Sequence, residues 1–227
     1  SGFAIKTNGT LWAWGKNSAG QLGIGNTQAQ TAPVQVGADM DWKQVAAGCS
    51  SVLALKTDGS LWGWGFNMYS ELFGHEGKQL SPVRLGSETD WEQVVVIDFR
   101  AYAVKKDGTL WAWGDNANNL LGFNTPTEEE TTAEGNPVEV VTVPQITAPT
   151  HVTSIEGKVL TISGCENTLS VATGTDGVIE KVWMLGSNTD GALGDGKGLG
   201  NGNKDIPFAK VPVHPSLKSS LKFAGMS

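Results

Sequence analysis

The sequence predicts an all-β protein, a β-propeller of about four repeats of roughly 50 residues in which each repeat forms a four-stranded antiparallel blade. A segment with an Asn-Gly or Asp-Gly pair and a Trp-bearing run recurs at residues 4–15, 54–65, 103–114 and 172–186. The first Trp of each copy follows the previous one after 50, 49 and 72 residues, at Trp12, Trp62, Trp111 and Trp183. A fixed period of this length is typical of a repeat architecture, so local motifs are interpreted within the array.

Each copy begins with a predicted β-hairpin. The pairs at the turns are Asn8-Gly9, Asp58-Gly59, Asp107-Gly108 and Asp176-Gly177. These dipeptides favour a tight primed turn, in which both central residues have positive φ. The strand-forming residues on either side agree with this interpretation.

The Trp-bearing run predicts a strand with one aromatic face. Alternation places Trp12 and Trp14 on one side and Leu11 and Ala13 on the other, and the next two copies repeat the arrangement. Two stacked Trp side chains indicate a buried layer against a neighbouring sheet. A row of Trp residues that stack on a ligand is the alternative, and the regular strand spacing argues against it.

Asn-containing loops follow the Trp strands. The recurring positions are Asn17, Asn67, Asn116 and Asn188, each followed by Leu22, Leu72, Leu121 or Leu193. Asn at this position favours hydrogen bonds from its side chain to the loop backbone. We expect the leucines to anchor the loops to the core.

Two further runs complete the four strands of each repeat. Residues 33–36 and 82–85 predict short edge strands, because Pro cannot donate to a central ladder. Residues 42–48 recur as residues 91–97, and we expect them to form the inner strand of each blade. The chain is thus one predicted propeller array, residues 1–227, with repeats at approximately 1–50, 51–99, 100–167 and 168–227 and an insertion at 124–150.

Residues 46–74 follow the pattern A-A-G-x-S-x-x-x-A-L-K-x-D-G-x-L-W-x-W-G-x-N-x-x-x-x-L-x-G. This pattern resembles the regulator of chromosome condensation repeat, especially its bacterial and phage-borne versions, and the resemblance covers nearly the whole chain. It implies a propeller, usually seven-bladed, in which the sequence repeat is offset from the blade. Members include a nucleotide exchange factor for a nuclear small GTPase, inhibitors of β-lactamases and many surface proteins, so the resemblance implies less about function.

The chain departs from the family pattern in its inner strands. Many members carry a His shortly after the Ala-Gly of this strand, and the matching positions here are interpreted as Ser51, Arg100 and Leu169. The longer acidic insertions expected of the exchange factor are missing from the sequence.

These departures suggest a binding surface, because packing explains the shared residues of a repeat but not the odd ones. The candidate ligand-binding residues are Met68, Tyr69, Phe73, His75, Asp98, Phe99 and Arg100. Tyr and Arg are frequent in protein interfaces. The prediction is a non-catalytic recognition or scaffold module that binds a protein or surface ligand through rim loops. The alternative is that these residues fill a blade junction.

Composition narrows the function further. The chain has 16 basic and 23 acidic residues, a net charge of −7 and no basic cluster, which argues against nucleic-acid binding. No apolar stretch is long enough to span a bilayer. His75, His151 and His214 stand in unlike contexts, and no catalytic, metal or cofactor motif accompanies them, so we predict no enzyme, metal or cofactor. Cys49 and Cys165 are interpreted as buried free thiols.

Residues 223–227 match residues 46–50, and residues 1–6 continue that match as residues 51–56 do. Three arrangements stay open: a small closed ring, a partial ring completed by another chain through self-association, and a fragment of a longer protein. A structural component of a virion or cell-surface assembly and a regulator of another enzyme are the alternative functions. The family resemblance favours an extracellular, cell-surface or virion location.

Overall fold

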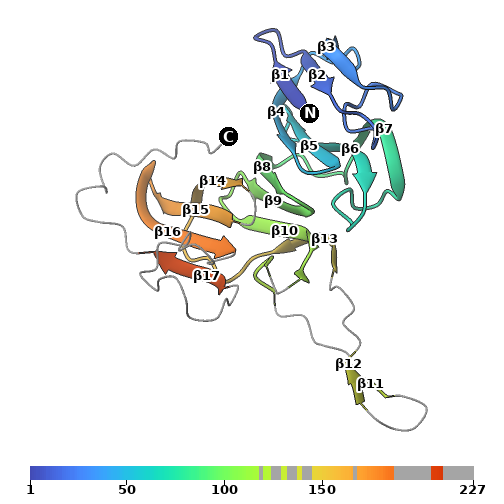
Figure 1. Cartoon of the computed structure of the whole chain (residues 1–227). Coiled ribbons are helices and arrows are strands. Elements are labelled where there is room, and N and C mark those ends of the chain that lie inside the picture. Colours follow the sequence, from blue (N-terminus) through green and yellow to red (C-terminus); the bar gives the residue numbers. More distant parts are fainter. Residues whose placement is uncertain are drawn as a thin grey trace.

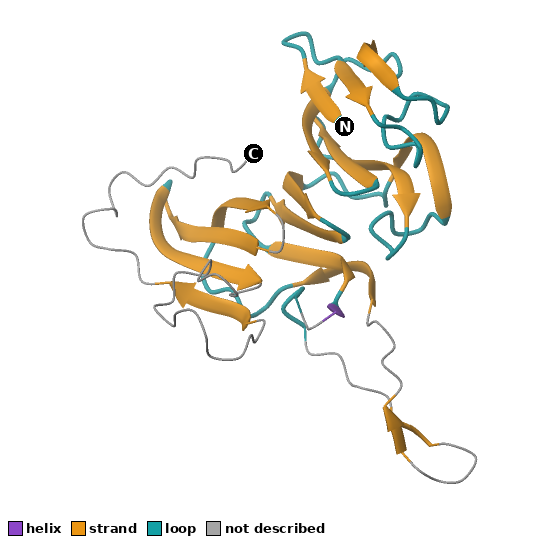
Figure 2. Cartoon of the chain, in the orientation of Figure 1, coloured by secondary structure: helices purple, strands orange, loops and turns teal. Residues whose placement is uncertain are grey.

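The computed structural model describes residues 1–117, 120–123, 129–131, 137–139, 145–165, 168–186 and 206–211. Strands make up almost all the regular structure of these residues (Figure 2). They form three four-stranded sheets, one three-stranded sheet and a separate two-stranded hairpin, all antiparallel within the described residues. The all-β propeller architecture predicted from the sequence is confirmed.

The blades follow one another along the chain (Figure 1). The first contains β1 (Gly2–Ile5), β2 (Leu11–Gly15) and β3 (Gln30–Gln35). The second contains β4 (Trp42–Ala47), β5 (Ser51–Lys56), β6 (Leu61–Asn67) and β7 (Gly77–Arg84). The third contains β8 (Trp91–Ile97), β9 (Arg100–Lys105), β10 (Leu110–Asp115) and β13 (Gln145–His151). The fourth contains β14 (Val159–Cys165), β15 (Thr168–Thr175), β16 (Val178–Gly186) and β17 (Ile206–Val211).

The inner strands β4, β8 and β14 bring neighbouring blades together, and β1 contacts β4. Gln44 joins β4 to β8: its side-chain nitrogen donates to the Val94 carbonyl (2.9 Å), and its side-chain oxygen accepts from the Val94 amide (3.0 Å). Gln93 on β8 repeats this arrangement with the backbone of β14, at Leu160 and Ile162. At both junctions, a glutamine side chain makes the hydrogen bonds to the neighbouring inner strand that a paired backbone would otherwise make.

The blades have two ends, which we name by their connections. The loop face carries the β4–β5 and β8–β9 turns and the connections that follow β2, β6 and β10. The linker face carries the Asn-Gly and Asp-Gly turns and the links between blades, residues 36–41, 85–90 and 152–158. Because the strands alternate in direction, every second connection lies on the same face.

Three of the four predicted primed turns are wrong. Gly9, Gly59 and Gly108 have φ of 81°, 85° and 88°, but the residue before each is not in the left-handed region. Each Gly amide instead donates to the carbonyl three residues earlier, as Gly59 does to Lys56 (3.0 Å). This is the longer hairpin loop with Gly in the left-handed position. Only Asp176 and Gly177, at 49° and 76°, both have positive φ.

The Asp or Asn at these turns organises the following strand. The Asp58 carboxylate accepts from the Ser60 amide (2.8 Å) and hydroxyl (2.6 Å), and the Trp62 indole donates to the same hydroxyl (2.9 Å). The first and third blades repeat these bonds from Asn8 and Asp107. The side-chain relay fixes the orientation of the first Trp of the strand.

In the second and third blades, the second Trp of the strand is buried as the sequence predicts, whereas Trp14 and the first Trp of each of the three strands are only partly buried. Trp64 and Trp113 are fully buried, and each packs against the preceding blade. The Trp64 indole donates to the Gln21 carbonyl (2.9 Å), and the Trp113 indole donates to the Glu71 carbonyl (2.8 Å). Burying a ring of this size is among the largest contributions one side chain makes to a core.

The prediction for the Asn loops is confirmed in the first three blades. The side-chain oxygens of Asn17, Asn67 and Asn116 accept from the amides of Leu22, Leu72 and Leu121 at 2.9, 3.0 and 2.9 Å. The three leucines are fully buried. Asn188, Leu193 and the terminal segment 223–227 lie outside the described residues.

The fourth repeat differs from its predicted alignment by one residue. Ser51 pairs with Gly65 and Arg100 pairs with Gly114, and the residue that pairs with Gly186 is Thr168 rather than Leu169. A register irregularity between Thr173 and Gly174 accounts for the shift. Leu169 therefore lies on the opposite side of the strand from the expected position.

The predicted insertion at 124–150 contains two kinds of structure. β11 (Glu129–Thr131) and β12 (Pro137–Glu139) form a hairpin that stands apart from the blades (Figure 1). β13 pairs with β10 as the outer strand of the third blade. The added residues thus enter between two strands of a blade without interrupting it.

Candidate functional site

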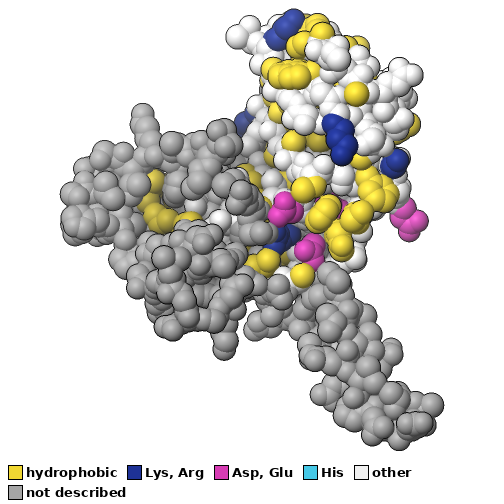
Figure 3. All heavy atoms as spheres, viewed as in Figure 1, with side chains coloured by type: hydrophobic (Ala, Val, Ile, Leu, Met, Phe, Trp, Pro, Cys, Tyr) yellow, Lys and Arg dark blue, Asp and Glu magenta, His cyan; other side chains and the backbone are white. Residues whose placement is uncertain are grey.

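The candidate residues lie on two connections of the loop face, in neighbouring blades. Met68, Tyr69, Phe73 and His75 follow β6, and Asp98 and Phe99 form the turn between β8 and β9. Figure 3 shows hydrophobic side chains gathered where the end of the second blade meets the third, with acidic and basic side chains beside them. All the predicted positions thus fall on one end of the molecule.

Tyr69 and Phe99 contact each other across the blade junction. Their ring centroids are 4.9 Å apart with an interplanar angle of 49°, and both side chains are partly exposed. Met68, directly before Tyr69, has 48% of its surface exposed. We call Met68, Tyr69 and Phe99 the aromatic patch. Partly exposed, fixed aromatic rings are typical anchors of protein interfaces.

Charged groups lie next to Phe99. Asp98 has φ of 53°, which the tight turn requires, and its carboxylate pairs with the guanidinium of the buried Arg100 (3.2 Å). The same carboxylate accepts a hydrogen bond from the Cys49 thiol (3.4 Å). Arg100 is therefore an ion-paired support of the turn rather than an exposed anchor.

Cys49 is exposed, so the prediction that its thiol is buried is wrong. Its place in the turn after β4 corresponds to that of Asp98 after β8. Partial burial raises the pKa of the Cys49 thiol, and the hydrogen bond to Asp98 and its charge raise it further. A thiol held in the protonated form is a poor nucleophile. The side chain of Cys165 lies outside the described residues.

Phe73 and His75 belong to the other side of the same loop. The Phe73 ring meets Trp113 edge-on at 5.6 Å and joins the core between the second and third blades. The His75 ring lies 3.2 Å from the Arg84 carbonyl, with its nitrogen Nε2 nearest. Phe73 thus packs at the junction of the second and third blades, whereas His75 contacts β7 of its own blade.

Glu71 is a buried residue that the sequence analysis missed. Its carboxylate accepts from the Tyr69 amide (2.8 Å) and the Ser51 hydroxyl (3.4 Å). Burial raises its pKa, and the hydrogen bonds lower the pKa by less. The sequence repeat could have identified this position, because Gln21 precedes Leu22 in the first blade as Glu71 precedes Leu72 in the second. In the structure, the Gln21 side chain accepts from the Ala19 amide as Glu71 accepts from the Tyr69 amide.

The described residues show no group of three or more His, Cys, Asp or Glu side chains that could hold a metal ion. Within those same residues, no helix is long and apolar enough to cross a membrane.

The sheets, their order and their inner-strand contacts define the chain as an array of β-propeller blades. The regulator of chromosome condensation (RCC1) repeat model matches residues 8–55. The matched segment runs from the first hairpin turn into β5, and the second and third blades repeat the loop hydrogen bond between its Asn17 and Leu22.

Solved structures share this architecture. Human WBSCR16 superposes with a TM-score of 0.70 at 17% identity, over 93% of this chain and 50% of its own. Prp20p from Saccharomyces cerevisiae gives 0.71 at 16% identity, over 93% and 48%. The complex of Kap60 with yeast RCC1 (Prp20) gives 0.69 at 17%, over 93% and 46%. The chain spans about half the length of these proteins, and at such identities the likeness concerns the fold.

Proposed function

We propose that this chain is a non-catalytic recognition module that binds a protein partner through the aromatic patch on its loop face. The observation that carries the proposal is the contact between Tyr69 and Phe99, which joins two blades and remains partly exposed beside the exposed Met68. A rigid pair of rings can bind a partner with little loss of side-chain freedom.

The solved relatives support a role in protein binding. Yeast RCC1 (Prp20) was crystallised bound to Kap60, and Prp20p was described with binding properties to Gsp1p and histones. For this chain, the absence of a basic cluster and the net charge of −7 favour a protein over a nucleic acid as partner.

The test is a paired capture experiment with the wild-type chain and Met68→Asp as baits, in extract from the source cells, followed by quantitative mass spectrometry. A charge in the middle of an apolar contact should weaken binding by roughly a hundredfold, because one buried unpaired charge costs several kcal/mol. We expect at least one protein to be retained by the wild type and lost with the variant.

Met40→Asp is the matched control. Met40 is exposed to 61% and lies in the link between β3 and β4 on the linker face. Its variant introduces the same charge at a methionine that is also exposed, and it should keep the partner. Loss with both variants, or with neither, would contradict the proposed location of the site.

A second proposal concerns the edge of the first blade. Its sheet has three strands in the described residues, and β1 pairs with β2 on one side only. An unpaired strand edge is a template for another strand. We propose that a strand from a second copy of the chain completes this blade by self-association.

The other expectations remain predictions from the resemblance. They are a structural role in a virion or cell-surface assembly, an exchange-factor or inhibitor activity, and an extracellular, cell-surface or virion location. The aromatic patch is compatible with any of these roles, since all of them require a protein contact.

A further inference from the structure

Two blades carry the same charged and aromatic cluster on the linker face. In the third blade, the Lys105 ammonium pairs with Glu88 (2.9 Å) and Asp90 (3.3 Å). It also lies over the rings of Trp91 (4.8 Å) and Trp111 (4.6 Å). The second blade repeats these contacts around Lys56, with Asp39, Asp41, Trp42 and Trp62. In each blade, the two acids and the first of these Trp residues belong to one segment, made of the inner strand and the link before it.

The first blade has half of this cluster in the described residues. Lys6 has the position of Lys56, because each is the first residue of its hairpin turn, and the Lys6 ammonium lies 3.7 Å from the centre of the Trp12 ring. No carboxylate pairs with Lys6 in the described part of the chain. Lys6 is exposed, whereas Lys56 and Lys105 are buried. The missing half is what an inner strand and its link supply in the other two blades.

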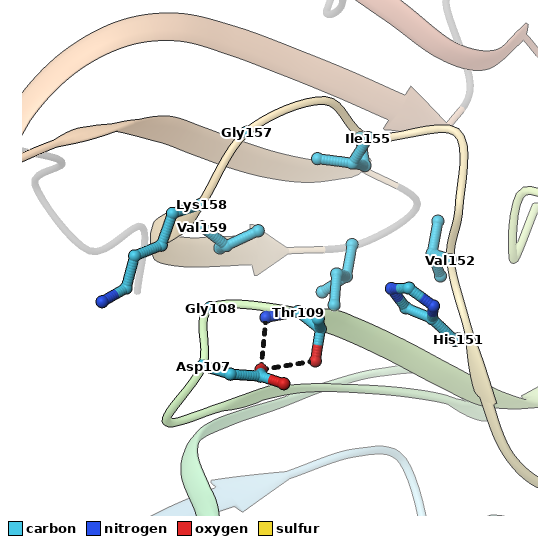
Figure 4. Close-up of a pocket in the computed structure, with 10 residues that line it drawn as sticks. Asp107, Gly108, Thr109, His151, Val152, Ile155, Gly157, Lys158 and Val159 are labelled. Carbon is cyan, nitrogen blue, oxygen red and sulfur yellow. Dashed lines mark hydrogen bonds between the residues drawn. The ribbon is translucent and has the colours of Figure 1, made fainter.

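The fourth blade shows that the members of the cluster change together. Thr173 replaces the lysine, and it pairs with Val159 in the register of the lysine and the inner Trp of the other blades. Lys158 precedes Val159, where an aspartate precedes the inner Trp, and Figure 4 shows both residues beside the cavity at this junction. The one acid of this link, Glu156, pairs with Lys181 of the fourth blade (2.7 Å). A blade that keeps the lysine, as the first does, is therefore expected to receive acids and a Trp.

The inner strands also supply a glutamine that the first blade lacks among the described residues. Gln44 joins the second blade to the Val94 backbone of the third, and Gln93 joins the third blade to the fourth. Val45 on β4 has the register of Val94 on β8, since each pairs with the equivalent Ala of the next strand. Within the described residues, no glutamine side chain bonds to the Val45 backbone. In both complete strands, the glutamine comes two residues after the inner Trp.

We propose that the β1 edge binds an extended segment of a partner protein with the pattern acid-x-Asp-Trp-x-Gln. The inference rests on the strand addition proposed above, and it names the chemistry of the strand that fits this edge. The two acids pair with the Lys6 ammonium, the Trp ring packs against Trp12, and the glutamine bonds to the Val45 backbone. In the register of the other blades, the partner's Trp lies opposite Lys6 and its glutamine opposite Ile5.

A second copy of the chain does not offer such a segment freely. The pattern occurs at residues 39–44 and 88–93, and both segments are held inside their own blades. Residues 216–221, which precede the C-terminal match to residues 46–50, have Ser216, Lys218, Ser219 and Leu221 at the four positions. A second copy thus pairs with β1 without these side-chain contacts, and a segment with the full pattern should displace it.

The experiment is a titration of a fluorescein-labelled peptide of residues 38–47 with the chain, followed by fluorescence anisotropy. We expect saturable binding with a dissociation constant on the order of 10–100 μM, because part of the contact energy is lost in ordering a short peptide. Three altered peptides should each bind about tenfold more weakly: Asp39→Asn with Asp41→Asn, Trp42→Ala, and Gln44→Ala. An excess of the unlabelled peptide should also lower the mass of the self-associated chain in light scattering.

Lys6→Gln is the decisive variant of the chain. Lys6 is exposed, so the first blade should fold with Gln at this position. The variant should bind the labelled peptide about tenfold more weakly, and it should no longer distinguish that peptide from the one with two asparagines. Lys16→Gln is the matched control, because Lys16 is also exposed and lies at the other end of the same blade. It should bind the peptide as the wild type does.

Three results would overturn the inference. The first is no saturable binding of the peptide up to about 1 mM chain, well above the expected dissociation constant. The second is equal binding of the altered peptides, or unchanged binding by Lys6→Gln. The third is binding by a chain that ends at Val211 but not by the full chain, which would mean that the chain's own C-terminal segment occupies the edge.

These failures are distinct from a failure of the proposed self-association. A chain that self-associates but does not bind the peptide would contradict the pattern and leave strand addition by a second copy standing. A chain that stays monomeric but binds the peptide through Lys6 would contradict self-association alone. Neither result bears on the aromatic patch, since that surface lies on the loop face.

Discussion

At the scale of single residues, Glu71 is a position where the second repeat differs from the first but keeps the same fold. Glu71 replaces the Gln found at the same loop position in the first blade, and its carboxylate is fully buried. Burial raises its pKa, so the folded protein holds the proton more tightly than the unfolded chain does. The free energy of unfolding therefore falls as pH rises from the ordinary glutamate value through the folded one.

Glu71→Gln should therefore stabilise the protein at neutral pH. Gln keeps an oxygen for the Tyr69 amide and removes the buried charge, so we expect a gain of about 1 kcal/mol at pH 7. The measurement is the midpoint of urea unfolding between pH 4 and pH 8. The advantage of the variant should shrink as the pH is lowered. A variant that is no more stable at pH 7, or an advantage that grows in acid, would contradict the assignment.

Gly59 is required by both its conformation and its surroundings. It has φ of 85°, and a Cβ atom there would overlap the Thr89 carbonyl in the next link. Gly59→Ala should lower the free energy of unfolding by more than about 1 kcal/mol. Gly77→Ala is the control, because Gly77 has φ of 68° with open space around it and reports the conformational cost alone. The measurement is thermal unfolding of both variants. An equal loss of stability in the two would contradict a role for the close approach of Gly59 to Thr89.

The sequence could identify these positions but not their partners. Asn17 and Leu22 were predictable, because both partners belong to one short loop whose pattern repeats. The contacts of Tyr69 with Phe99 and of Cys49 with Asp98 were not, since they join segments about 30 and 49 residues apart. Such pairs depend on how one blade sits against the next, which periodicity alone does not determine.

At the scale of elements, one Asn arrangement recurs in the loops that follow β2, β6 and β10. The side chain of Asn67 holds the β6–β7 loop by accepting from the Leu72 amide (3.0 Å) and donating to the carbonyls of Leu72 and His75. Asn17 does the same in the first blade, where it is fully buried. The loop that carries the aromatic patch is thus fixed by its own repeat residue.

Asn67→Ala and Asn17→Ala should both destabilise the chain, by about 1–3 kcal/mol, because buried loop donors and acceptors lose their partners. Only Asn67→Ala should also reduce partner capture, since it releases the loop with Met68 and Tyr69. Unfolding and capture are measured on the same preparations. If Asn17→Ala reduces capture to the same degree, loss of stability rather than of the patch explains the effect.

The hairpin turns and the fourth blade differ from the structure that the sequence predicts. The Asp-Gly and Asn-Gly pairs marked the hairpins correctly, but hydrogen bonds to Thr10, Ser60 and Thr109 favour the longer loop over the two-residue primed turn. The predicted alignment of the fourth repeat rests on matching Ala172 and Asp176-Gly177 to the earlier copies. The register irregularity between Thr173 and Gly174 shifts the actual strand pairing by one residue from that alignment. Local side-chain bonds and bulges are not visible in an apolar pattern.

At the scale of the whole molecule, the first sheet has an unpaired edge at β1 within the described residues, and this edge allows a test of the proposed self-association. Ala4 is exposed on β1 and pairs with Trp12, on the side of the sheet away from the second blade. Ala4→Glu places a charge beside the free edge, where charges oppose strand addition. We expect the wild type to increase in mass with concentration in light scattering, and the variant to stay monomeric.

Ala32→Glu is the control for that measurement, because Ala32 is exposed on β3, at the other edge of the same sheet. It should associate as the wild type does. A strictly monomeric wild type across the concentration series, or the same masses for both variants, would contradict completion of the blade at β1.

The central claim is that the loop face recognises a protein through Met68, Tyr69 and Phe99. The most direct measurement is amide hydrogen exchange of the chain with and without its captured partner. The account predicts protection of residues 67–73 and 97–100, with no change in residues 37–41 on the linker face. Protection confined to the linker face, or to the blade edges with the aromatic patch unchanged, would contradict it.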